Sequence, residues 1–126
     1  MRAVDTNVLV RLITGDDPKQ VAAAEEFVHR GAWVSQLAVA ETAWVLATTY
    51  QREPSGVASA LEMLLDNRHL TIEDSEVVSA AIEKFRAKPS VGFSDCLLLE
   101  IARKAGHLPL GTFDRDLGKL DGADKL

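Results

Sequence analysis

Short apolar runs alternate with longer helical segments along the chain, and this alternation limits the folds that it can adopt. The runs that predict strands are residues 2–5, 32–35, 70–72 and 108–112. Apolar residues at helical spacing predict helices near 7–13, 17–30, 37–50, 56–66, 75–87 and 94–105. Strands that alternate with helices indicate an α/β fold with a parallel sheet. The chain of 126 residues is long enough for one domain, and no linker or internal repeat divides it.

The composition excludes several classes of protein. With 47% apolar and 26% charged residues, the chain has the composition of a globular protein. A single cysteine, Cys96, excludes an intramolecular disulfide and a cysteine-rich zinc site. No signal peptide and no apolar run of about 18 residues is visible, so we expect a cytoplasmic protein without a membrane span. The net charge of −5 at first argues against a nucleic-acid partner.

Glu41 is the only charged residue between Arg30 and Arg52. This stretch predicts a strand followed by a largely buried helix, with Trp33 and Trp44 in the core. A carboxylate inside such a helix is unusual unless it is paired, protonated or bound to a metal. The alternative is that Glu41 lies on a narrow solvated stripe of the helix.

Three acidic residues are expected at one edge of the sheet. Asp5 ends the first strand, Asp114 follows the fourth, and Glu41 lies in the second turn of a helix that follows the second. Strand ends and helix starts gather at one edge of a parallel sheet, where ligands usually bind. Asp95 begins a helix that no strand precedes, so spacing alone does not bring it to this edge. Asp5, Asp95 and Asp114 could instead be helix N-caps.

A cluster of carboxylates needs a counter-charge. Unpaired carboxylates a few ångströms apart repel one another, and a divalent cation relieves this repulsion. A site built from oxygen atoms alone suits Mg²⁺ or Mn²⁺. If much of the negative charge belongs to such a site, the net charge does not exclude RNA.

Four segments together resemble the PIN-domain nucleases, most closely the VapC-type toxins of toxin–antitoxin pairs. They are Val4-Asp5-Thr6-Asn7-Val8-Leu9, Val39-Ala40-Glu41-Thr42, Ser94-Asp95-Cys96-Leu97-Leu98 and Thr112-Phe113-Asp114-Arg115-Asp116-Leu117. The resemblance covers essentially the whole chain as a single PIN domain, residues 1–126. It implies a three-layer α/β/α sandwich around a short parallel sheet of four to five strands.

The resemblance also implies an activity, a cofactor and partners. The activity is that of a Mg²⁺- or Mn²⁺-dependent endoribonuclease, with Asp5, Glu41, Asp95 and Asp114 as the catalytic and metal-ligating residues. Asp116 is a possible accessory, and Asn7, Ser94 and Thr112 are expected to orient carboxylates or water. A VapB-type antitoxin and a homodimer are the expected partners besides RNA. Arg11 and Arg115 are candidates for phosphate contacts.

Two features depart from the family pattern, and other functions compete with it. Residues 120–126 are short and polar, so a fifth strand is doubtful, and Pro109 could weaken the fourth. A two-component receiver domain would need adjacent acids after the first strand, an aspartate after the third and a lysine after the fifth. Here the third strand leads to Glu73-Asp74, and no such lysine is evident. A dehalogenase-type phosphatase would need Asp-x-Asp where this chain has Asp5-Thr6-Asn7. The remaining alternative is a catalytically inactive PIN-like interaction module.

Overall fold

The computed structural model describes all 126 residues, which form two compact units, Met1–Ser75 and Glu76–Leu126. The amino-terminal unit contains β1 (Arg2–Ala3), α1 (Thr6–Thr14), α2 (Pro18–Val28), β2 (Ala32–Val34), α3 (Gln36–Thr48), α4 (Pro54–Asp66) and β3 (Leu70–Ile72). The carboxy-terminal unit contains α5 (Ser75–Ala87, except its first residue), the 3₁₀-helix η1 (Pro89–Val91), α6 (Phe93–Ala105), β4 (Leu110–Thr112), the 3₁₀-helix η2 (Leu117–Lys119) and β5 (Ala123–Lys125). Six α-helices and short parallel strands confirm the predicted α/β class.

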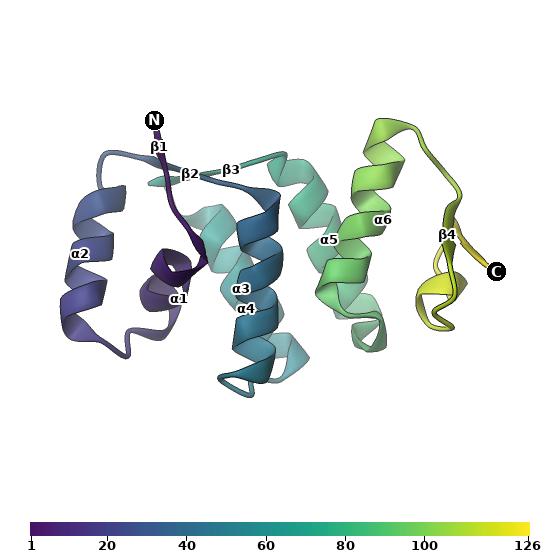
Figure 1. The fold of residues 1–126 in the computed structure, drawn as a ribbon, viewed down its shortest axis with the longest axis horizontal. Coiled ribbons are helices and arrows are strands. Elements are labelled where there is room, and N and C mark those ends of the chain that lie inside the picture. Colours follow the sequence, from purple (N-terminus) through teal and green to yellow (C-terminus); the bar gives the residue numbers. More distant parts are fainter. The chain divides into compact units, whose positions relative to one another are not determined.

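In the amino-terminal unit, three parallel strands form a sheet with β2 at its centre. Ala32 of β2 is aligned with Arg2 of β1 on one side and with Leu70 of β3 on the other. Parallel strands require crossovers, and α1 with α2 supplies the first while α3 with α4 supplies the second. α1 packs against both α2 and α3, and α3 packs against α4 (Figure 1). The carboxyl ends of the three strands therefore lead to the starts of three helices at one edge.

Local sequence signals explain where the first helices begin and end. Asp17 precedes Pro18 and caps α2 by accepting a hydrogen bond from the backbone N–H of Gln20, at 3.1 Å. Gly15 ends α1 in the left-handed region, at φ 65°, where a residue with a Cβ would be strained. The helices bury aliphatic side chains, and the largest fully buried ones in this unit are Leu9, Val10, Val34, Val39, Leu46 and Leu61. No helix in the structure combines the length and the apolar character needed to cross a membrane.

The carboxy-terminal unit contains the fifth strand that the sequence left in doubt. β4 and β5 pair in parallel, with Gly111 aligned to Asp124, and the backbone N–H of Leu126 donates to Thr112. β5 is short and mostly exposed, so it tolerates polar residues. Its sequence therefore lacks the apolar pattern that predicts a strand. Pro109 precedes the first residue of β4, so it removes no hydrogen bond from the ladder.

The structure corrects the expectation that both tryptophans lie in the core. Trp33 is 37% exposed, and Trp44 is 65% exposed. The stretch around them has few charges, but its apolar residues divide between two faces of α3. Leu37 and Trp44 lie on the exposed face, whereas Val39 and Leu46 lie on the buried face. A low charge density therefore did not mean burial here.

Candidate active site

Asp5 connects β1 to α1 and caps the helix. Its Oδ1 accepts a hydrogen bond from the backbone N–H of Val8, at 3.1 Å. The interpretation of Asp5 as an N-cap is therefore confirmed. The side chain is exposed, and the cap uses Oδ1 alone. A carboxylate held in this way by a helix terminus keeps oxygen lone pairs for a second ligand.

Glu41 lies on the exposed face of α3, so the prediction that it is buried is wrong and the solvated-stripe alternative is correct. The hydroxyl of Thr6 donates a hydrogen bond to Glu41 Oε1, at 2.9 Å. Because Thr6 directly follows Asp5, this bond holds Glu41 near the start of α1. The structure thus brings Glu41 next to the segment that carries Asp5, as the sequence predicted from the sheet edge.

A further acid lies at this edge, and the sequence analysis did not select it. Glu73 directly follows β3, and its Oε1 accepts a hydrogen bond from the backbone N–H of Gln36, at 2.9 Å. Ser35, which follows β2, caps the same helix by accepting from Ala38, at 3.1 Å. The signal for Glu73 was the one used for Asp5, an acid immediately after a strand. Its carboxylate fixes the first turn of α3, which carries Glu41 one turn later.

In the carboxy-terminal unit, Asp95 and Asp114 interact through their charges. Asp95 lies in the first turn of α6, where partial burial and, second, the negative charge of Asp114 raise its pKa. Asp114 follows β4, and its Oδ1 accepts from the backbone N–H of Leu117, at 2.8 Å. Thr112 Oγ1 accepts from the backbone N–H of Asp114, at 3.0 Å, so the threonine fixes the turn that carries the carboxylate. Asp116 forms no capping hydrogen bond at the start of η2.

Cys96, next to Asp95, is fully buried, which confirms that it is a core residue. Burial and the nearby charges of Asp95 and Glu100 raise the pKa of its thiol to about 11. A thiol with that pKa is protonated at neutral pH and is a poor nucleophile.

Arg11 makes hydrogen bonds to three other side chains. Its Nε donates to Gln20 Oε1 at 2.5 Å, and its Nη1 donates to the Tyr50 hydroxyl at 3.2 Å and to Asp16 at 3.3 Å. The Tyr50 hydroxyl in turn donates to Asp16 Oδ2 at 2.7 Å. These contacts connect α1, α2 and Tyr50, which lies just beyond the end of α3. Arg11 therefore stabilises the helix packing, while Arg115 is exposed beside Asp114.

The donor chemistry of the four predicted ligands fits a hard divalent cation. All four are carboxylates, and the repulsion between Asp95 and Asp114 is the kind that such a cation relieves. The acids occur as two pairs, one in each unit, and no group of three or more His, Cys, Asp or Glu residues that could hold a metal is assembled. Mg²⁺ keeps several waters and often takes only one or two carboxylates from a protein, so a pair is an adequate minimum.

Comparison with known proteins gives one match. The family model described as "PIN domain" matches residues 2–123, nearly the whole chain. No curated protein and no solved structure matches the chain significantly. The matched range includes all four acids of the candidate site.

Proposed function

Because this chain belongs to the PIN domain family, we propose that it is a metal-dependent endoribonuclease and the toxin of a VapBC-type toxin–antitoxin pair. PIN domains are generally nucleases and usually use Mg²⁺ or Mn²⁺. The proposed catalytic and metal-ligating residues are Asp5, Glu41, Asp95 and Asp114, within a single PIN domain of residues 1–126. RNA is the proposed substrate, and a VapB-type antitoxin and a second copy of the chain are the proposed protein partners.

The carboxylate pair of Asp95 and Asp114 is the observation that carries this proposal. Burial and, second, the negative charge of Asp114 raise the pKa of Asp95, so the ionised carboxylate disfavours the folded state when no counter-ion is present. Helix capping does not account for the pair, because Asp95 lies inside the first turn of α6, whose N-cap is Gly92. A bound divalent cation would offset the negative charge of the pair and would also offset charge on the scissile phosphodiester.

Neighbouring polar groups orient the proposed ligands. Thr6 holds one oxygen of Glu41, and the backbone N–H of Val8 holds one oxygen of Asp5. The backbone N–H of Leu117 does the same for Asp114. In each case only one oxygen of the carboxylate accepts the hydrogen bond, and the second oxygen is the one proposed to bind the metal. Hydrogen bonds of this kind fix the direction of metal ligands and raise metal affinity.

Cleavage of RNA tests the proposal directly. Purified protein is incubated with a labelled single-stranded RNA in Mg²⁺, in Mn²⁺ and in EDTA. We expect internal cleavage with either metal and none with EDTA. Asp95→Asn should reduce the rate by more than about a hundredfold, because losing even an outer partner of a metal ligand costs about 10- to 100-fold.

Asp66→Asn is the matched control for the loss of one negative charge. Asp66 is exposed at the end of α4 and belongs to neither acidic pair, so the rate should not change. Cleavage that persists in EDTA or in Asp95→Asn would overturn the proposed mechanism.

An inactive interaction module is the second candidate, and the exposed face of α3 favours it. Leu37 is 70% exposed and Trp44 is 65% exposed, on either side of Glu41 along the helix. Apolar side chains gathered at such a site are typical of protein interfaces. A chain that cuts no RNA under any metal condition but binds an antitoxin peptide tightly would support this candidate.

A further inference from the structure

Two hollows meet along α2 in the amino-terminal unit. The first has a volume of about 410 Å³ and is lined by Asp5 and Asn7 of the α1 start and by residues of α2. The second has a volume of about 860 Å³ and surrounds the end of α2, next to Arg2 of β1. Ala23 and Phe27 line both hollows, so the second continues the first. Together they form a path that begins at Asp5.

The first hollow has the chemistry that a nucleobase requires. Val8, Ala24 and Phe27 supply apolar surface against which a flat ring can lie. Asn7 adds a side-chain amide, which can both donate to and accept from the edge of a base, and Gln20 adds amide N–H donors, since its Oε1 accepts from Arg11. Proteins that bind single-stranded RNA combine apolar or aromatic surface with such polar groups.

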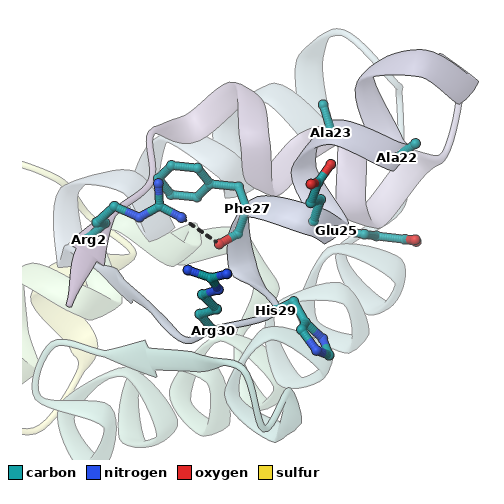
Figure 2. A pocket seen from close by; sticks show the side chains of 8 residues that line it. Arg2, Ala22, Ala23, Glu25, Phe27, His29 and Arg30 are labelled. Carbon is teal, nitrogen blue, oxygen red and sulfur yellow. Dashed lines mark hydrogen bonds between the residues drawn. The ribbon is translucent and has the colours of Figure 1, made fainter.

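The second hollow is lined by two arginines, Arg2 and Arg30, and by two glutamates, Glu25 and Glu26. The guanidinium of Arg2 lies over the ring of Phe27, 3.8 Å from its centroid, and donates to the Phe27 carbonyl at 3.3 Å. Figure 2 shows Arg30 reaching toward the same carbonyl from the turn after α2, while Glu25 points away from both arginines. Neither guanidinium is paired with a carboxylate. Arginines in this state are the usual ligands of phosphate groups.

We propose that a single-stranded RNA follows this path, with a base in the first hollow and backbone phosphates at Arg2 and Arg30. The proposal rests on the proposed function, which makes RNA the substrate and places Asp5 at the site of cleavage. The stacked Arg2 side chain is already ordered by Phe27, so little side-chain freedom is lost when a phosphate binds.

Binding is measured by fluorescence anisotropy of a labelled single-stranded RNA of about ten nucleotides. EDTA is present, so binding is separated from cleavage. Arg30→Ala should weaken binding about fivefold at 0.1 M salt, because one phosphate contact to a single strand contributes a slope of about 0.7 in log K against log[salt]. The slope itself should fall by about 0.7 in the variant. Lys19→Ala, which removes an exposed positive charge from α2 outside both hollows, should change neither quantity.

Ala23→Glu tests the junction of the two hollows. Ala23 is exposed on α2, so the variant is expected to fold, but it places bulk and negative charge in the path. Binding should weaken by at least as much as in Arg30→Ala. Ala47→Glu, on the exposed side of α3, gives the same net charge and should bind RNA as the original chain does.

The outcomes separate this inference from the proposed function. If the chain cleaves RNA while Arg30→Ala and Ala23→Glu bind it normally, the path is wrong and the proposed function stands. If the chain binds RNA through these residues but does not cut it with any metal, the path stands and the nuclease proposal fails. If the variants leave RNA binding unchanged and alter the sedimentation coefficient, the hollows are an interface between copies of the chain, and the proposed path is overturned.

Discussion

The hydroxyl of Thr6 donates a hydrogen bond to the carboxylate of Glu41, 35 positions later in the sequence, at 2.9 Å. Thr6 is the first residue of α1 and follows the cap residue Asp5. This one contact connects the start of α1 to the second turn of α3. It gives the Glu41 carboxylate a fixed direction although the side chain is exposed. Its loss should affect the proposed chemistry more than the fold.

Thr6→Val removes this hydrogen bond while keeping the shape of the side chain. We expect the cleavage rate to fall about tenfold, the lower range for losing a group that orients a metal ligand. The free energy of unfolding should change by less than about 1 kcal/mol, because the bond is exposed to solvent. Thr6→Ser should restore activity. Thr48→Val, which removes an exposed hydroxyl from α3, is the control. Equal loss of activity in both valine variants would contradict a specific role for Thr6.

Burial raises the pKa of Asp95 most, and Asp114→Asn tests the second cause, the repulsion from Asp114. A raised carboxyl pKa means that the penalty is absent below the ordinary value of 3.8 and develops as the pH rises through the raised pKa. In EDTA at pH 7, the variant should therefore have a higher Tm than the original chain. Its amide oxygen can still accept from Leu117.

Mg²⁺ should reverse the order of the two Tm values. It should raise the Tm of the original chain and leave that of Asp114→Asn nearly unchanged, since only the intact pair binds the ion. Asp124→Asn, on the exposed strand β5, should respond to Mg²⁺ as the original chain does. A variant that gains as much stability from Mg²⁺ as the original chain would show that the pair is not a metal site.

Tyr50→Phe should make stability less dependent on acid pH. The hydrogen bond from Tyr50 and, second, that from Thr14 hold the pKa of Asp16 below its ordinary value of 3.8. A lowered carboxyl pKa gives stability that is present above 3.8 and is lost as the pH falls through the lowered pKa. The variant should therefore be less stable than the original chain at pH 7, and the difference should shrink in acid. Urea unfolding across pH 2–7 measures this, and a difference that is constant with pH would contradict it.

Gly118→Ala and Gly56→Ala should have opposite effects on stability. A Cβ at position 118 would lie 2.7 Å from Lys125 Cβ and 3.4 Å from Lys125 Cα, so β5 must shift, at a cost of about 1–3 kcal/mol. At position 56, inside α4, the nearest atom is 3.8 Å away, so alanine should stabilise the helix by about 0.5–1 kcal/mol. Urea midpoints of the two variants check both signs. A neutral Gly118→Ala would mean that β5 does not pack closely against η2.

The sequence predicted the class of fold and the order of its elements because both depend on local patterns. The predicted helix at 37–50 is α3, at Gln36–Thr48, and the strand at 70–72 is β3 with the same bounds. β5 was in doubt because its pairing with β4 depends on Gly118, on the turn at Gly122 and on Arg103, which donates to the Asp121 carbonyl at 2.7 Å. Those contacts join residues that no short sequence window contains.

The sequence by itself determined which side chains are available for chemistry. It gave four carboxylates and their places after strands or near helix starts, at Asp5, Glu41, Asp95 and Asp114. Tertiary structure decided which side of each helix faces solvent. It placed Trp44 and Glu41 on the exposed side of α3, where the low charge of residues 31–51 had suggested burial. It also brought in Thr6 and Glu73, whose hydrogen bonds fix the start and direction of α3. The physical reason is that burial and orientation depend on which faces pack together, and packing is a property of the whole fold.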